Sequence, residues 1–123
     1  MTDSSDSFKQ IFSQLCPLLR KHSTKLVLIT DNDNTLYYNT HHVMKNGKPL
    51  YFGSVQIKKN YVSFHLMPVY VFPELLDNIS PALRKRMQGK SCFNFSKSDE
   101  QLFSELDTLT SSGLTSYENA NYI

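Results

Sequence analysis

Apolar residues near the N-terminus recur at intervals of three and four positions, which is the spacing of one face of an amphipathic helix. The positions on this face are Phe8, Ile11, Phe12, Leu15 and Leu19. Asp6 or Ser7 is the expected cap, since short polar side chains accept hydrogen bonds from the first helical amides. Pro17 lacks a backbone N–H and its ring crowds the preceding turn, so we expect a kink or break near Cys16.

The next pattern predicts two strands joined by a tight turn. Residues 25–30 and 35–39 are rich in apolar and β-branched side chains, and the sequence Asp31-Asn32-Asp33-Asn34 lies between them. Asp and Asn side chains hydrogen-bond to their own backbone and tolerate left-handed conformations, so this segment favours a turn. A second turn signal, of the kind that joins the strands of a hairpin, is Asn46-Gly47.

The clearest strand signal lies in the middle of the chain. Residues 51–58 and 61–67 alternate apolar and polar side chains on either side of Lys59-Asn60. We therefore expect them to pair as an antiparallel hairpin. Pro68 cannot donate a hydrogen bond to a strand ladder, so it is expected to limit the second strand or to mark an edge.

Short helices and a last strand are predicted after this hairpin. Pro73 and the pair Ser80-Pro81 each begin a short helix, because proline fits the first helical turn and serine is a good cap. Gly89 is expected to end the second of these helices as a glycine cap, and a strand follows at residues 90–95.

One more amphipathic helix is predicted near the C-terminus. Ser98 and Gln101 have the spacing of a capping box. The apolar positions that follow are Leu102, Phe103, Leu106 and Leu109. We expect this helix to stop near Gly113, because the last ten residues show no periodicity.

Together these elements predict an α+β fold. It is a single domain in which the N-terminal and C-terminal helices pack on an antiparallel sheet of about five strands. The chain has 123 residues and a mass of 14.2 kDa, which fits one domain. We expect a frayed N-terminus at residues 1–7, the domain at residues 8–113 and a tail at residues 114–123.

Composition and charge narrow the classes of protein that the chain can belong to. It is 40% hydrophobic and 20% charged, and no apolar run approaches the length of a membrane helix. The polar start lacks the features of a secretion signal, so we expect a cytoplasmic protein with no membrane partner. The net charge of +2 is too weak to indicate nucleic acid by itself, and Arg84, Lys85 and Arg86 are typical of a solvated helix face. No nucleic-acid partner is therefore expected.

The alternation of side chains also indicates a candidate binding site. In the second strand of the hairpin, Val62, Phe64 and Leu66 share one face, while Tyr61 and His65 lie on the other with Ser63 and Met67. In the last predicted strand, Lys90 and Cys92 share a mixed face, opposite Ser91, Phe93 and Phe95. If the two mixed faces adjoin, a pocket forms on the sheet. The candidate ligand-binding residues are Tyr61, His65, Lys90 and Cys92; a partly buried structural histidine is the alternative for His65.

Metal and cofactor sites are not predicted. Cys16 and Cys92 are far apart and fit no Cys/His ligand spacing, so they are expected to be reduced core residues. His41 and His42 lie in a presumed loop. With Asp31 and Asp33 they are the only plausible cluster of hard metal ligands.

The segment from Asp31 to Leu36 suggests a remote enzymatic alternative. An apolar strand followed by Asp31-x-Asp33-x-Thr35 resembles the first motif of haloacid-dehalogenase-type phosphatases, in which the first aspartate attacks phosphorus and both help to hold magnesium. Those enzymes also need a parallel sheet, a phosphate-binding lysine and a later pair of carboxylates. The turn interpretation of this segment is preferred.

The order of these patterns resembles a known family. The hairpin at residues 51–70, the Gly89-Lys90 step before an aromatic strand, and the closing helix together resemble the YdhG-like bacterial family, a domain of unknown function. The resemblance covers Phe8 to Gly113 and implies a single α+β domain that is distantly frataxin-like in fold. It also implies iron handling as a possible function, although the first helix here carries Lys9, Arg20 and Lys21 and has acidic residues only at its start.

The sequence therefore favours an uncharacterised small cytoplasmic protein that is a non-catalytic binding or interaction module. Its partner is an unknown small molecule or a protein, bound at a modest pocket on the sheet, and a homodimer is possible. A frataxin-like protein that handles iron or another metal is the alternative, and a magnesium-dependent phosphatase using Asp31 and Asp33 is the remote one.

Overall fold

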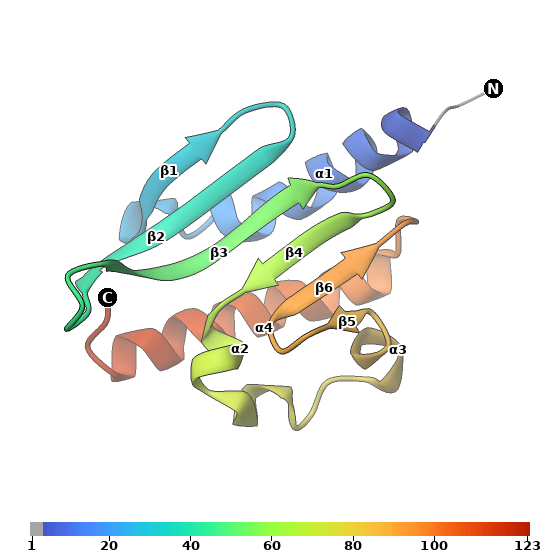
Figure 1. Ribbon diagram of the computed structural model, residues 1–123. Helices are drawn as coiled ribbons and strands as arrows, with labels where there is room; N and C mark the ends of the chain where they lie inside the picture. The colour runs from blue at the N-terminus through green and yellow to red at the C-terminus, as the bar shows by residue number, and fades with distance from the viewer. Residues whose placement is uncertain (1–3) are drawn as a thin grey trace.

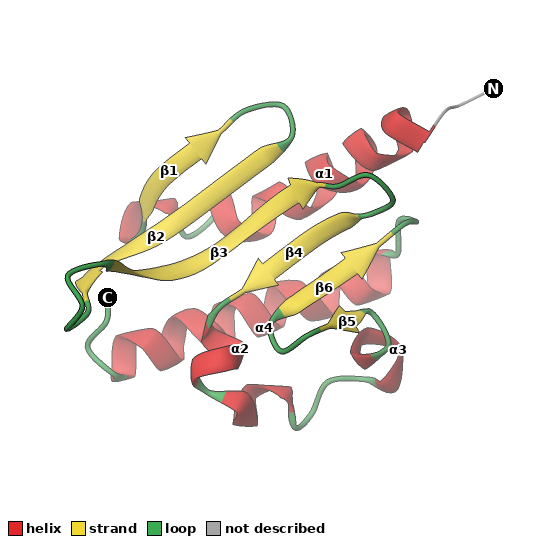
Figure 2. Cartoon of the chain, in the orientation of Figure 1, coloured by secondary structure: helices red, strands yellow, loops and turns green. Residues whose placement is uncertain are grey.

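The fold is one antiparallel sheet with two long helices on the same face (Figures 1 and 2). A computed structural model describes residues 4–123. The sheet has six strands in the order β1-β2-β3-β4-β6-β5. The strands are β1 Val27–Asp31, β2 Thr35–Val43, β3 Pro49–Ile57, β4 Val62–Leu66, β5 Met87–Gln88 and β6 Cys92–Phe95.

Helices begin and end the chain, and short helices connect β4 to β5. They are α1 Ser4–Arg20, η1 Ser23–Lys25, α2 Pro68–Val71, η2 Pro73–Leu76, α3 Pro81–Arg84 and α4 Glu100–Asn119, of which η1 and η2 are 3₁₀ helices. The predicted α+β class, with an antiparallel sheet and a helix from each end of the chain, is confirmed. No helix within residues 4–123 is long and apolar enough to cross a bilayer.

The predicted hairpin and turns form as expected. β3 and β4 pair from Gly53 opposite Leu66 to Ile57 opposite Val62, and β4 ends before Pro68, the first residue of α2. In the turn after β1, the Asn32 Oδ1 accepts hydrogen bonds from the backbone amides of residues 34 and 35, at 3.0 and 2.9 Å. The β2–β3 turn has Gly47 at a φ of 82°, a conformation that glycine adopts without steric cost.

Two strands carry irregularities in their pairing. The β1–β2 register shifts between Leu28 and Thr30, which leaves Ile29 as an extra residue on the edge strand. The β2–β3 register shifts between Tyr38 and Asn39, because Tyr38 lies opposite Gly53 while Asn39 lies opposite Tyr51. Each shift changes the face of the sheet toward which the following side chains point.

The first helix differs from the prediction. It begins at Ser4, before the expected caps Asp6 and Ser7, and it runs without a break through Pro17 to Arg20. Pro17 lies on the exposed face of α1, where water can hydrogen-bond to the carbonyl that loses its helical partner. The expected break near Cys16 is therefore wrong. Residues 1–3 of the predicted frayed start lie outside the described residues.

The segment after α3 also differs. Ser80 caps α3 as predicted, because its Oγ accepts a hydrogen bond of 3.1 Å from the backbone N–H of Leu83. The helix ends at Arg84, however, and Met87 pairs with Phe93 as part of β5. Gly89, with a φ of 77°, therefore lies in the turn between β5 and β6 and does not cap a helix.

The last helix has a different cap and a later end than predicted. The Asp99 side chain accepts from the backbone N–H of Leu102, and the Ser98 hydroxyl instead donates to Gln14. The helix passes through Gly113 to Asn119, so the expected stop near Gly113 is wrong. Burial of Leu114 and Tyr117 explains the extension, since these apolar contacts stabilise two further turns.

The core lies between the helices and one face of the sheet. Val62, Phe64 and Leu66 are fully buried on this face, as predicted from the alternation. Phe95 packs edge to face against Phe103 of α4, with ring centroids 5.0 Å apart. The opposite face of the sheet, here called the open face, has no helix over it (Figure 1).

This division into faces predicts the cost of two substitutions. Phe93→Ala should lower the free energy of unfolding by about 3–5 kcal/mol, because Phe93 is fully buried and its truncation leaves a cavity. Lys90→Ala should change it by less than about 0.5 kcal/mol, because Lys90 is exposed. Urea unfolding curves measure both values. A larger loss for Lys90→Ala than for Phe93→Ala would contradict the assignment of faces.

A second prediction concerns the contact between α4 and α2. A Cβ at Gly113 would lie 2.8 Å from the Cβ of Pro68, whose ring cannot move aside. Gly113→Ala should therefore lower the melting temperature, although alanine in a helix is ordinarily favoured over glycine by about 1 kcal/mol. Ser112→Ala, at the exposed neighbouring position, is the control and should raise it slightly. Stabilisation by both changes would show that the helices can move apart freely.

Candidate binding site on the open sheet face

Side chains from four neighbouring strands meet on the open face. Residues that are directly opposite in paired strands point to the same side of a sheet. Tyr37 of β2 lies opposite Ser54 of β3, Ser54 lies opposite His65 of β4, and His65 lies opposite Cys92 of β6. These four residues therefore form one continuous line across the face that the helices leave uncovered.

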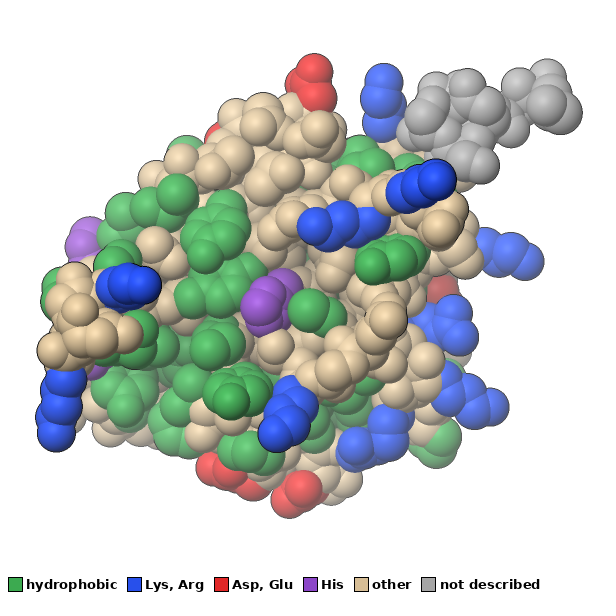
Figure 3. All heavy atoms as spheres, viewed as in Figure 1, with side chains coloured by type: hydrophobic (Ala, Val, Ile, Leu, Met, Phe, Trp, Pro, Cys, Tyr) green, Lys and Arg blue, Asp and Glu red, His purple; other side chains and the backbone are tan. Residues whose placement is uncertain are grey.

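Three aromatic rings cover the centre of this line. Tyr37 and Tyr51 are stacked, with ring centroids 4.6 Å apart and planes inclined by 21°. The ring of Tyr51 meets His65 edge to face, at 4.7 Å and 73°. All three side chains are partly exposed, and we call them the aromatic row. Figure 3 views this face and shows a histidine near its centre among hydrophobic side chains.

A chain of hydrogen bonds fixes the central ring. The hydroxyl of Tyr51 donates to Ser54 Oγ, and Gln56 Nε2 donates to the same oxygen at 3.2 Å. Lys58 Nζ in turn donates to Gln56 Oε1 at 2.8 Å. Burial raises the pKa of Tyr51, so its hydroxyl is protonated at neutral pH. The ring of Tyr51 is thus held in place before any ligand arrives.

His65 is oriented by Ser91. Its Nε2 lies 2.6 Å from Ser91 Oγ, and burial lowers the pKa of His65 and favours the neutral ring. Ser91 was expected on the core face of the last strand. It lies in the turn before β6, where strand alternation does not set the direction of its side chain. A serine and a histidine are two members of an acyl-transfer triad, but no carboxylate among the described side chains of residues 7–123 hydrogen-bonds to His65.

The four residues predicted to form the site are only partly brought together. His65 and Cys92 are cross-strand neighbours, as expected. Tyr61 precedes β4 by one residue, about 13 Å along the strand from His65 at 3.3 Å per residue. Lys90 lies in the β5–β6 turn, with its Nζ 5.8 Å from the ring centroid of Tyr70.

Lys90 and Tyr70 belong to a separate hollow beside the sheet. Its volume is about 650 Å³, and its other walls come from α2, η2 and the β5–β6 turn. Sequence reasoning missed Tyr37, Tyr51 and Ser91. The alternation placed individual side chains on faces, but only the strand register shows which of them touch.

The alternative metal cluster does not assemble. Asp31 and Asp33 lie at one end of β2, whereas His41 and His42 are near the other end and belong to the strand, where a loop was expected. His42 packs against Tyr122, with ring centroids 4.6 Å apart. Across the part of the chain that the structure describes, no group of three or more His, Cys, Asp or Glu side chains could hold a metal ion.

The phosphatase motif also has a different role. Arg20 holds both carboxylate oxygens of Asp31, at 2.8 and 3.0 Å, and this ion pair lowers the pKa of Asp31. β1 pairs antiparallel with β2, so Asp31 is not at the end of a parallel strand. The turn interpretation holds, with Asn32 as its capping residue.

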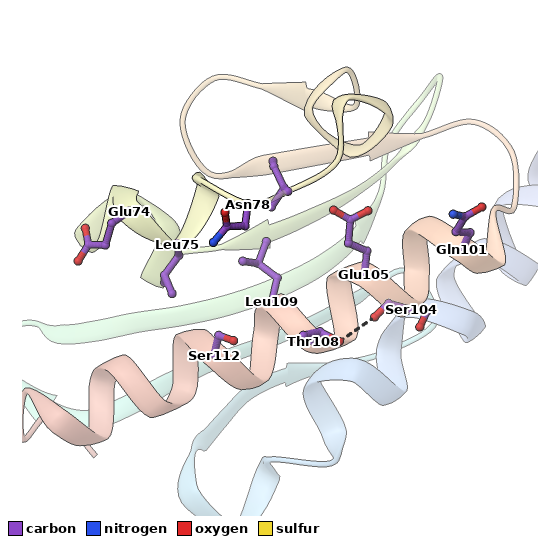
Figure 4. Close-up of a pocket in the computed structure, with 10 residues that line it drawn as sticks. Glu74, Leu75, Asn78, Gln101, Ser104, Glu105, Thr108, Leu109 and Ser112 are labelled. Atoms are coloured by element: carbon purple, nitrogen blue, oxygen red, sulfur yellow. Dashed lines mark hydrogen bonds between the residues drawn. The ribbon is translucent and has the colours of Figure 1, made fainter.

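A hollow on the helix side is a weaker candidate for a binding site, because a central charged side chain there is already hydrogen-bonded. It has a volume of about 550 Å³ between η2, the loop after it and α4 (Figure 4). Glu105 is one of its two carboxylates, and both Glu105 oxygens accept hydrogen bonds from Ser80, at 2.6 and 2.7 Å. Cys16, as expected, is a buried free cysteine, and burial raises its pKa to about 11.

The state of His65 predicts a pH dependence of stability. Because burial lowers the pKa of His65, the unfolded chain takes up a proton there more readily than the folded protein. The free energy of unfolding should be highest above the ordinary histidine pKa of 6.5 and should decrease as the pH falls below it. In His65→Gln, the free energy of unfolding should fall less as the pH decreases than in the parent protein. Part of the fall should remain, because burial also lowers the pKa of His22.

Urea unfolding at about pH 7.5 and pH 5 measures the effect. Asn39→Ala, an uncharged change on the same face, is the control and should leave the pH dependence as it is in the parent protein. The same decrease in His65→Gln as in the parent would contradict the prediction.

Comparisons with protein-family models, with curated proteins and with solved structures found no match. The similarity to the YdhG-like family remains a prediction from the sequence. The candidate site therefore rests on the geometry of this chain, and its central feature is the aromatic row on the open face.

Proposed function

We propose that the protein is a non-catalytic binding module that holds its ligand on the open face, over the aromatic row. One observation carries the proposal: two helices cover one face of the sheet, while the other presents Tyr37, Tyr51 and His65 side by side. Aromatic rings on a protein surface supply large contact areas and favour flat or apolar partners.

The arrangement suits binding because it is formed in advance. Tyr51 is fixed by Ser54, and His65 is fixed by Ser91, so a ligand need not order these rings. Fewer degrees of freedom are then lost when the ligand binds, which favours affinity. Cys92 borders the row, and the partner in this proposal is a small molecule or a protein segment with a flat surface.

The proposal places the protein in the bacterial cytoplasm, in keeping with the resemblance stated above. A homodimer is compatible with it. Metal handling and phosphatase activity have less support, because their expected ligands Asp31 and His42 are engaged by Arg20 and Tyr122.

Nuclear magnetic resonance titrations test the location of the site. Indole, benzoate and adenosine are added separately to the labelled protein, and amide shifts are followed. At least one of these flat probes should shift the amides of residues 37, 51 and 65, and Tyr37→Leu should weaken its binding. Tyr122→Leu, on the helix side, is the matched control and should leave binding unchanged.

Shifts confined to the helix-side hollow, around Ser104 and Thr108, would place the binding site elsewhere. Equal weakening by the two tyrosine substitutions would indicate a general loss of structure. Either result would contradict a site on the aromatic row.

A further inference from the structure

The charges of this chain are divided unevenly between two sets of sequence segments. Residues 34–73 and 78–98 contain nine of the 13 basic residues and none of the 11 acidic residues. These two ranges hold strands β2 to β6. The rest of the chain, which includes α1 and α4, has four basic residues and every acidic one. The net charge of +2 conceals this separation.

Three of the four basic residues outside these ranges form ion pairs, and those inside the ranges form none with the described side chains. Ion pairs join Arg20 to Asp31, Lys21 to Asp107 and Lys25 to Glu118. Among the side chains that the structure describes, those of residues 7–123, none of the nine basic residues in the strand-bearing ranges takes part in an ion pair. The turns that border the open face therefore carry a positive potential.

Five lysines of the strand-bearing ranges lie around the open face. Exposed lysines lie in the β2–β3 turn, in the β3–β4 turn at the opposite end of the sheet, and in the β5–β6 turn; they are Lys45, Lys48, Lys58, Lys59 and Lys90. The first two turns are separated by the length of β3, about 30 Å for nine residues. Figure 3 shows Lys and Arg side chains at several points around this face and acidic side chains only near its margins.

We propose that the open face binds single-stranded nucleic acid, with bases stacked on the aromatic row and phosphates beside the lysines of the turns. This inference rests on the proposed binding site over the aromatic row, and it assigns a nucleic-acid strand as the ligand in place of a small molecule or a protein segment. Open antiparallel sheets with aromatic side chains on adjacent strands stack unpaired bases, and a positive rim attracts the backbone. Tyr37 stacks on Tyr51 and is partly exposed, with Thr30 of β1 opposite it, so a base would stack on the exposed part of this pair.

The same chemistry favours a single strand over other polyanions. In a duplex the bases are already stacked on one another, so they cannot reach Tyr37. An acidic peptide would satisfy the lysines but would leave the rings without flat partners. The contribution of the rings therefore separates nucleic acid from a purely electrostatic ligand.

Fluorescence anisotropy tests the proposal with four labelled probes. They are the 12-nucleotide strands rU12 and dT12, a 12-base-pair DNA duplex and a peptide of 12 glutamates. The single strands should bind at least five-fold more tightly than the duplex and the peptide at equal salt. The ratio of the affinities for rU12 and dT12 shows whether the protein prefers RNA or DNA.

Variants with matched controls test each part of the surface. Lys58→Gln with Lys59→Gln should weaken binding and reduce the slope of log affinity against log salt, by about 0.7 for each phosphate that a lysine no longer neutralises. Lys21→Gln with Lys25→Gln removes the same charge from the helix side and should leave that slope unchanged. Tyr37→Leu should weaken binding five-fold or more, whereas Tyr37→Phe keeps the ring and should retain it.

Equal affinity for the glutamate peptide, or no effect of Tyr37→Leu, would overturn the nucleic-acid proposal. So would light scattering that showed dimers of the parent protein and monomers of Tyr37→Leu, because a second copy would then cover the open face. If adenosine shifts the amides of the aromatic row but no oligonucleotide binds, this inference fails and the proposed binding module stands.

Discussion

Every feature of this protein depends on the burial of one sheet face by two helices from opposite ends of the chain. Leu15 and Leu19 of α1 and Leu106 of α4 are fully buried against the strands. A domain of this size has only one such core, and its apolar surface supplies most of the driving force for folding. Because both helices are used on one side, the other side of the sheet is left for polar and aromatic side chains.

The local chemistry of the sequence determined much of this arrangement in advance. Alternation placed Phe64 and Phe93 in the core, and Asn32 and Gly47 marked the turns, because each signal depends on neighbouring residues only. The predicted break at Pro17 and the predicted helix end near Gly113 were wrong for the opposite reason. Their effect depends on where they lie in the folded domain: Pro17 faces water, and Gly113 lies against Pro68.

The candidate site was harder to predict because it depends on register. His65 and Cys92 could be placed on one face from their own strands, and they do meet. Tyr51 joins them only because the β2–β3 register shifts beside it, and Ser91 turns toward His65 from outside a strand. Charge showed the same limit. The total of +2 does not reveal that lysines gather in the turns, because their distribution is a property of the folded sheet.

The extra residue in β1 has a consequence for the behaviour of the molecule in a crowded solution. β1 is the longer of the two edge strands, and Leu28 and Ile29 on it are half exposed. A flat apolar edge of this kind would recruit strands from other chains and begin aggregation. The bulge interrupts the regular row of donors and acceptors that such recruitment requires, and β5, with two residues, is too short to act as a template. Neither edge of the sheet therefore offers a long, regular template for another strand.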